Sequence, residues 1–332
     1  MNDNLPLVSI ITPAYNRASY LDETIQSVLG QDYPRIEYIV LDDGSTDNTK
    51  DVLQKYTGRI IWETHPNMGE ARTVNKGWSM AHGEIVTVVN SDDPILPGAV
   101  SAAVAFMKTH PDILVAYPDW DFIGADSKPA GHTRVPEYDY LRMLKYHDCM
   151  PGPGTFIRRK SFELTSMRDP DIRYVNDFEY WLRLGLYGEF ARIPQTLATW
   201  RFHPDATSLT GRGTAMANEH VHLVEKLYSL PALAFKVSSA RTQAFSSAHL
   251  HAATLCNGAR WAAFRHSLSA ILSHPVIPFC GWLNWRRWAA VFLVMLPEPL
   301  GNLGRKLWYT NRSTSFKTLA FLRRHFNVRK GE

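Results

Sequence analysis

The chain has 332 residues, of which 45% are hydrophobic, 20% charged and 12% aromatic, and its formal net charge is +4. This composition is typical of a globular protein and excludes a collagen-like or largely disordered chain. Three cysteines without C-x-x-C spacing argue against a disulfide framework and a thiolate zinc site, and the length predicts one large domain with a smaller appendage.

The first 117 residues alternate short strands with amphipathic helices. Apolar residues between the strands recur at steps of three or four, as in Leu21, Ile25 and Val28, and this spacing predicts helices. Because parallel neighbouring strands need a crossover connection, the alternation predicts an α/β fold with a mostly parallel sheet and helices on both faces. The predicted strands are rich in Val and Ile: Val8–Thr12, Glu37–Leu41, Arg59–Trp62, Glu84–Val89 and Ile113–Tyr117.

Beyond this region the pattern is less regular and ends in a helical segment. The elements expected there are a helix at Tyr138–Lys145, a strand at Gly154–Arg158, a helix at Asp177–Tyr187 and a strand at Thr196–Phe202. From about Asn218 the chain is Ala-rich with helical spacing. The predicted organisation is therefore an α/β domain in residues 1–217 and a helical extension in residues 218–332.

Acidic residues follow two of the predicted strands. Asp42 and Asp43 come after the second strand, and Asp92 and Asp93 come after the fourth, at the sheet edge where such folds bind ligands. The loop after the first strand has no glycine, so a dinucleotide fingerprint and a P-loop are missing there. Neighbouring carboxylates repel unless a cation compensates them, so we expect Mg²⁺ or Mn²⁺ and a diphosphate ligand.

Five strings then carry a resemblance to a known family: VSIITPAYNRASYL, VLDDGSTDNT, NMGEARTVNKG, VVNSDD and VNDFEYWLRL. In this order they resemble the inverting GT-A glycosyltransferases of family 2, over roughly residues 7–205. The resemblance implies metal-dependent transfer of a sugar from a nucleotide-sugar donor, most commonly a UDP-sugar, to an acceptor hydroxyl. The implied acceptor is a glycan or a lipid-linked glycan in cell-surface polysaccharide or glycolipid synthesis.

The resemblance also implies which residues bind the nucleotide sugar. Pro13 and Tyr15 match the loop that packs on the nucleobase, and Asp43 matches the acid that hydrogen-bonds the base. Arg72 matches an arginine that contacts the donor. Ordinary roles stay open, because Tyr15 also suits packing and Arg72 also suits a solvent-exposed position.

A metal site is implied by the D-x-D-type motif. Asp93 corresponds to the direct metal ligand, and Asp92 corresponds to a contact with the metal or the ribose. Asn90 stands where the family commonly has a further acid. Arg201 and His203 fall in a W-R-x-H string whose histidine approaches the diphosphate or the metal in related enzymes. A helix-entry cap for the two acids, and a structural role for the histidine, are the alternatives.

The general base is expected at Asp177. This residue matches the family's acid in an E-D-x-[DE] motif, although Asn176 replaces the glutamate that usually precedes it. Asp177 would remove the proton from the acceptor hydroxyl as that oxygen attacks the anomeric carbon with inversion. An acid in the first turn of a helix is also favourable without catalysis. A non-catalytic nucleotide-sugar-binding or scaffold protein of the same fold is therefore the rival interpretation.

The C-terminal segment is basic and rich in tryptophan. Residues 286–332 contain ten Lys and Arg against two Glu, and Trp282, Trp285, Trp288 and Trp308 lie in or beside this segment. Its apolar run is too short to span a bilayer, so we expect a helix on an anionic membrane surface or a cap packed on the first domain. No nucleic-acid motif accompanies the charge, so no nucleic acid is expected as a partner. With no signal peptide visible, the predicted location is cytoplasmic, peripheral at the inner membrane face.

Overall fold

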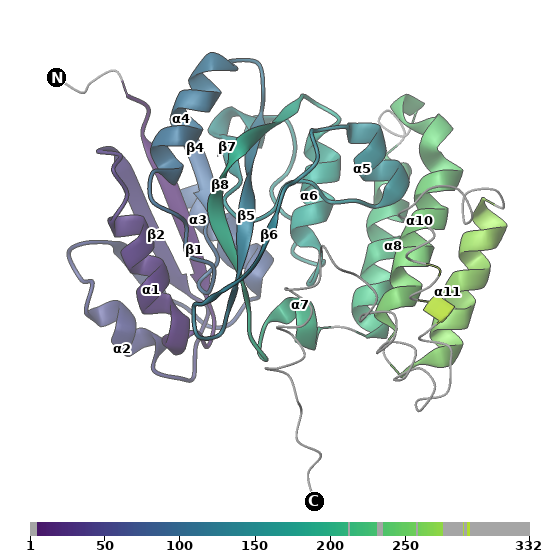
Figure 1. The fold of residues 1–332 in the computed structure, drawn as a ribbon, viewed down its shortest axis with the longest axis horizontal. Coiled ribbons are helices and arrows are strands. Elements are labelled where there is room, and N and C mark those ends of the chain that lie inside the picture. Colours follow the sequence, from purple (N-terminus) through teal and green to yellow (C-terminus); the bar gives the residue numbers. More distant parts are fainter. Residues whose placement is uncertain are drawn as a thin grey trace, which may run out of the picture. The chain divides into compact units, whose positions relative to one another are not determined.

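The computed structural model describes residues 5–211, 213–230, 235–256, 258–274, 288 and 291–292. The chain divides into two compact units (Figure 1). The first unit contains Met1–Tyr138 and Met150–Arg201, and the second contains Asp139–Cys149 and Phe202–Glu332. The units part after Arg201, whereas the functional division after residue 217 stays a prediction.

The first unit is built on a mixed sheet with the order β3-β2-β1-β4-β7-β5-β6, and β8 pairs with β5. Its strands are β1 Val8–Ala14, β2 Ile36–Asp42, β3 Ile61–Thr64, β4 Ile85–Val88, β5 Val115–Gly124, β6 Pro129–Thr133, β7 Phe156–Arg158 and β8 Phe190–Phe202. The strands from β3 to β4 are parallel, and the β4–β7, β7–β5 and β5–β6 pairs are antiparallel. The α/β fold with flanking helices is confirmed, and its sheet is half parallel and half antiparallel.

Strand β1 continues two residues further than the sequence predicted. Pro13 pairs with Leu41 in the strand and does not lie in the loop after it. Pairing between β1 and β4 ends at Ile11, opposite Val88. A proline at position 13 therefore removes no hydrogen bond from that ladder, which is why the strand tolerates it.

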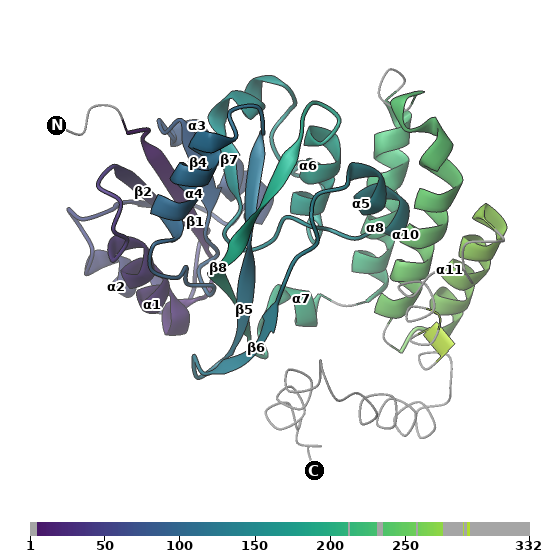
Figure 2. The same ribbon diagram turned by 45° about the horizontal axis from the view of Figure 1, so that its top comes forward.

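Helices cover both faces of the sheet (Figure 1 and Figure 2). The helices of the first unit are α1 Ala18–Leu29, α2 Thr49–Gln54, α3 Glu70–Met80, α4 Ala99–Thr109 and α6 Asn176–Leu184, with a 3₁₀ turn η1 at Arg159–Glu163. The predicted apolar positions of α1 and α4 are buried in one core cluster with Val8 and Ile10 of β1. On the opposite face, Trp78 of α3 stacks on Phe162 at 4.8 Å and contacts Tyr180 of α6 at 5.0 Å. Helix α6 is thereby fixed against α3.

The second unit is helical. It contains α5 Tyr140–Tyr146, α7 Thr207–Thr210, α8 Thr214–Ser229, a 3₁₀ turn η2 at Ser238–Ala240, α10 Arg241–Leu255 and α11 Arg260–Ser273. The helical spacing predicted from about Asn218 is interrupted between Leu255 and Arg260, and Gly258 in that interval has a φ of 73°, a value that glycine adopts readily.

Most of the predicted Trp-rich segment lies outside the described residues. Of its tryptophans, Trp288 is described, and it packs with Val291 against Leu250, Ala253 and Ala270. Trp282, Trp285 and Trp308 fall in the part that the structure does not describe. Among the helices that are described, none is both long enough and apolar enough to cross a membrane.

Candidate active site

Asp43 is anchored at the start of α3. It follows β2, its side chain is buried, and its two carboxylate oxygens accept the backbone N–H groups of Met68 at 2.7 Å and Gly69 at 3.0 Å. The preceding residue, Asp42, accepts the N–H of Ser45 at 3.1 Å, which is an ordinary turn contact. Asp43 therefore ties the carboxyl end of β2 to the N-terminus of α3.

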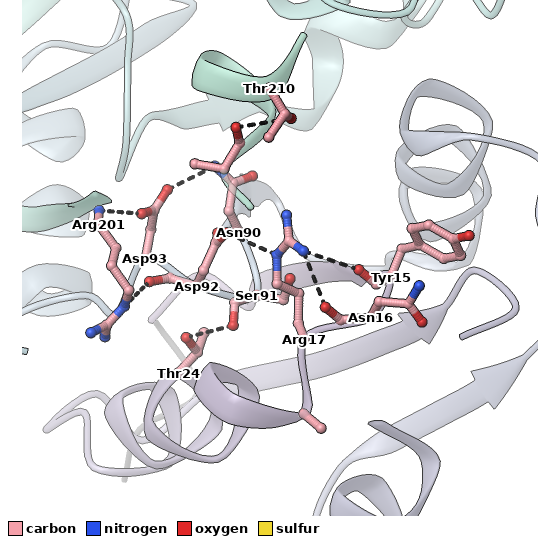
Figure 3. A network of polar contacts seen from close by, with 12 residues as sticks. Tyr15, Asn16, Arg17, Thr24, Asn90, Ser91, Asp92, Asp93, Arg201 and Thr210 are labelled. Atoms are coloured by element: carbon pink, nitrogen blue, oxygen red, sulfur yellow. Dashed lines mark hydrogen bonds and ion pairs between the residues drawn. The ribbon is translucent and has the colours of Figure 1, made fainter. Parts of the chain in front are cut away.

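Asp93 is a buried carboxylate at the carboxyl end of β4 (Figure 3). One oxygen accepts the backbone N–H of Arg201 at 2.7 Å, and the other accepts the side-chain amide of Asn90 at 3.0 Å. Burial, together with the charge of the adjacent Asp92, raises the pKa of Asp93 to about 8. Asn90 thus donates a hydrogen bond to Asp93, whereas the acid that the family commonly has at this position would repel the Asp93 carboxylate.

Asp92 forms an ion pair with a residue to which the sequence assigned no role. Arg17, in the loop after β1, donates from Nε to Asp92 Oδ2 at 3.0 Å, and both side chains are largely buried. The same guanidinium donates to the backbone oxygens of Tyr15 and Asn16. Arg17 lies in the loop after the first strand, at the edge of the sheet where such folds bind ligands. That position in the sequence was the only signal that could have pointed to it.

Strand β8 holds the acidic loop in place through Arg201, which is 1% exposed. Its Nε donates to the backbone oxygen of Asp92 at 2.7 Å, Nη1 donates to Ser127 and Gly124, and Nη2 pairs with Glu23 at 2.7 Å. Every guanidinium nitrogen is thus engaged by protein atoms. This geometry favours a positioning role for Arg201 over direct contact with a diphosphate.

Asp177 lies in the first turn of α6, where Oδ1 accepts the N–H of Phe178 at 2.7 Å. Burial raises the pKa of Glu70, the first residue of α3, and the charges of Asp177 and Asp92 raise it further. Glu70 follows directly after the N–H groups that bind Asp43. Arg168 contacts both Glu70 and Asn176, so the first turn of α6 lies beside the N-terminus of α3, where Asp43 is anchored.

Asn176, the other departure from the family pattern, contacts a buried arginine. Its side-chain oxygen accepts from Arg168 Nη1 at 2.9 Å, and the same nitrogen lies 3.1 Å from Glu70 Oε1. Arg168 is 6% exposed and stacks over Trp78 at 5.5 Å. The sequence assigned no role to Arg168 or Glu70. Arg168 lies in an irregular loop before α6, and the sequence pattern does not predict that this loop brings it to Glu70.

Three further residues were assigned to donor binding from the sequence. Tyr15 is 46% exposed, and its ring points away from Asp92 (Figure 3). Arg72 lies 3.4 Å from Asp171 and its side chain is half exposed. His203 is fully buried in the second unit, two residues after Arg201. Their roles stay predictions.

The acidic pair suits a divalent cation that shares its ligands with a substrate. Arg17 balances the charge of Asp92, and the buried carboxyl group of Asp93 lies beside it, so a divalent cation at this pair would offset the remaining repulsion between the two. Within the described residues, no group of three or more His, Cys, Asp and Glu is arranged to hold a metal ion. Mg²⁺ and Mn²⁺ need only one or two carboxylates when phosphate oxygens complete the shell, so Asp92 and Asp93 fit this kind of site.

Comparison with known proteins decides the family. The family model for glycosyl transferase family 2 matches residues 9–164. The chain is also 30% identical over 243 residues to the Escherichia coli UDP-Glc:alpha-D-GlcNAc-diphosphoundecaprenol beta-1,3-glucosyltransferase WfaP, covering 70% of this chain and 88% of WfaP. The chain is a family 2 glycosyltransferase. The match covers 68% of an uncharacterized Haemophilus influenzae glycosyltransferase and 59% of one from Rickettsia typhi.

Solved structures share the fold of this glycosyltransferase. Mannosyltransferase PcManGT from Pyrobaculum calidifontis, in complex with GDP-Man and Mn²⁺, matches with a TM-score of 0.56 and 16% identity, covering 99% of this chain and 89% of PcManGT. S. aureus TarS 1-349 matches with a TM-score of 0.55 and 16% identity, covering 96% of this chain and 91% of TarS. TarS has also been crystallised with UDP-GlcNAc.

Proposed function

We propose that this glycosyltransferase transfers a sugar from a UDP-sugar to a hydroxyl of a lipid-linked glycan acceptor, with inversion at the anomeric carbon and with Mg²⁺ or Mn²⁺ bound by Asp92 and Asp93. The observation that carries the proposal is the contact of Arg168 with both Glu70 and Asn176, which brings the turn that contains Asp177 to the N-terminus of α3, where Asp43 is anchored. A donor diphosphate and an acceptor hydroxyl would then approach one another from opposite sides of this point.

Each residue has a defined task in the proposed reaction. The divalent cation, when bound, supplies positive charge that stabilises the departing nucleoside diphosphate. Asp93 and Asp92 hold it, while Asn90 and Arg201 fix the Asp93 carboxylate through the two hydrogen bonds described above. Asp177 removes the proton from the attacking acceptor hydroxyl. We also assign Asp43, with Pro13 and Tyr15, to the nucleobase side, and Arg72 to the donor phosphates.

The substrate assignment draws on relatives. WfaP is named for transfer from UDP-Glc to a GlcNAc-diphospholipid. TarS binds UDP-GlcNAc, whereas PcManGT binds GDP-Man, so the nucleotide needs a direct test. We take UDP-glucose and a GlcNAc-diphospholipid as the first pair to assay, because WfaP is matched over most of its length.

Membrane association is also proposed, with α11 as the described surface that supports it. One face of α11 exposes Trp261, Phe264, Leu268 and Leu272 at steps of three and four, with Trp261 71% and Leu272 73% exposed. Such an apolar stripe, followed in sequence by a basic Trp-rich segment, suits an anionic lipid surface. Flotation with vesicles containing phosphatidylglycerol tests this, and failure to float at low salt would contradict it.

The function is tested by screening UDP-, GDP- and dTDP-sugars for thermal stabilisation with and without Mn²⁺, followed by product analysis. Asp177→Asn should abolish transfer while nucleotide affinity changes by no more than a few-fold. Unchanged turnover in this variant would remove Asp177 from the mechanism. Donor binding without turnover in the wild-type protein, across the acceptors assayed, would instead favour a non-catalytic sugar-nucleotide-binding protein.

A further inference from the structure

Glu70 has a position that the proposed function does not use. It is the first residue of α3, directly after Gly69, which has a φ of 88°. Its neighbours Met68 and Gly69 bind Asp43, so the backbone that carries Glu70 is fixed to the carboxyl end of β2. The side chain therefore starts from a rigid point in the candidate site.

Arg168 holds one oxygen of the Glu70 carboxylate. Its Nη1 lies 3.1 Å from Glu70 Oε1 and also donates to Asn176 at 2.9 Å. The backbone of Arg168 is fixed in turn by Asn75 of α3, which bonds both its N–H and its carbonyl oxygen, at 3.0 and 2.8 Å. Glu70 is thus oriented by a buried cation that is itself anchored to the same helix.

The other oxygen of Glu70 is available to a ligand. In the described part of the chain, its ion pair and hydrogen bond both use Oε1, and 45% of the side chain is exposed. Protein nevertheless lies close around the carboxyl group, and this desolvation raises its pKa. Because Arg168 Nη1 contacts both Glu70 and Asn176, Glu70 lies beside the first turn of α6, which contains the proposed base Asp177.

The chemistry of a carboxylate restricts what Glu70 can bind. An ionised carboxylate accepts hydrogen bonds and repels a diphosphate, so the donor phosphates are excluded as its ligand. A sugar ring offers hydroxyl and amide N–H donors and carries no charge. Because Glu70 lies near Asp177, which is proposed to face the acceptor hydroxyl, we expect Glu70 to contact the acceptor sugar and not the donor sugar.

We propose that Glu70, held by Arg168, is an acceptor-binding residue, which accepts a hydrogen bond from a second hydroxyl or amide N–H of the acceptor sugar while Asp177 faces the attacking hydroxyl. The inference rests on the proposed function. It predicts that the acceptor is a sugar with at least two hydrogen-bond donors on one side, not a simple alcohol.

The experiment measures transfer from UDP-glucose to a short-chain GlcNAc-diphospholipid by wild-type protein, Glu70→Ala and Glu70→Gln. A lost hydrogen bond to a charged group predicts a 10- to 100-fold higher acceptor KM for Glu70→Ala, a smaller rise for Glu70→Gln, and a donor KM within about three-fold. Glu63→Ala is the matched control, because Glu63 is 48% exposed and pairs with Lys76 at 2.6 Å, whereas Glu70 pairs with Arg168. It should leave both KM values unchanged.

Three results would overturn the inference, with the thermal midpoint of each variant showing that it is folded. A rise in donor KM would place Glu70 on the donor sugar. A fall in kcat at constant acceptor KM would mean that Glu70 acts only by holding Arg168 and α6. Unchanged kinetics would remove it from the site. If the wild-type protein does not use this substrate pair, or if Asp177→Asn stays active, the proposed function itself fails, which is a separate outcome.

Discussion

The backbone N–H of Arg201 donates to Oδ1 of Asp93 at 2.7 Å, although 108 residues separate the two in the chain. The same end of β8 also supports the rest of the acidic loop, through the hydroxyl of Thr199, which donates to the backbone oxygen of Pro94 at 2.6 Å. The geometry of the acidic pair after β4 is therefore set by a strand from the end of the first unit. A metal site with only two protein carboxylates depends on this support.

Arg201→Ala should lower both stability and metal affinity. The substitution removes the bonds to the backbone of Asp92, to Gly124 and Ser127, and to Glu23. We expect a loss of about 2 to 4 kcal/mol in the free energy of unfolding, measured by denaturant titration. Mn²⁺ affinity should fall at least several-fold at temperatures where the variant is folded. A stable variant with weakened nucleotide binding but unchanged Mn²⁺ affinity would instead indicate direct contact with the donor.

Arg17→Gln should change metal binding in the opposite direction. Arg17 places a positive charge 3.0 Å from Asp92, and this charge opposes a divalent cation at the same carboxylate. Without nucleotide, the Mn²⁺ affinity of the variant should rise a few-fold, as measured by electron paramagnetic resonance of free Mn²⁺. A fall in affinity would show that Arg17 orients Asp92 for the metal.

The helical unit should lose stability in mild acid. Burial and then the neighbouring His266 lower the pKa of His249 from 6.5 to about 4, and burial also lowers the pKa of His266. A histidine with a depressed pKa favours the folded state above its unfolded pKa, and this contribution disappears as the pH falls from about 6.5 toward 4. We expect the free energy of unfolding to fall by on the order of 1 kcal/mol between pH 7 and pH 5.

His249→Gln combined with His266→Gln should remove most of this acid sensitivity, as measured by thermal unfolding at both pH values. His222→Gln serves as the control, because the His222 side chain is 58% exposed. An unchanged pH dependence in the double variant would assign the effect to other groups.

Much of the parallel half of the sheet followed from the sequence, because its strands are short Val- and Ile-rich runs separated by clear helical periods. In the antiparallel half, strands overlapping β5, β7 and β8 were predicted, but β6, at Pro129–Thr133, was not, since it is a polar, Gly-containing strand whose pairing with β5 depends on tertiary contacts. The sequence also placed Pro13 in a loop, whereas neighbouring pairing allows it to stay in β1.

The same contrast applies to the site. Asp43 and Asp93 could be predicted as site residues because they lie in the loops that follow two strands of the parallel half. Glu70 and Arg168 could not be linked, because 98 residues separate them and their contact depends on a loop with no periodic pattern. Their contact could be recognised only in the folded structure.

Product stereochemistry gives a separate test of the single-base mechanism. Attack opposite the leaving group turns an α-linked UDP-glucose into a β-linked product, because one displacement inverts the anomeric carbon. Proton NMR of the product measures the anomeric coupling constant. A large coupling, typical of the β-glucoside, is expected, and an α-linked product would exclude direct displacement assisted by Asp177.

The central claim is that Asp92 and Asp93 bind the donor diphosphate through a divalent cation, and calorimetric titration of UDP in Mn²⁺ or in EDTA tests it most directly. For the wild-type protein, Mn²⁺ should tighten UDP binding by at least ten-fold, and for Asp93→Asn this enhancement should disappear while the thermal midpoint stays near or above that of the wild type. Equal UDP affinity in Mn²⁺ and EDTA, or an enhancement that survives in Asp93→Asn, would contradict the account.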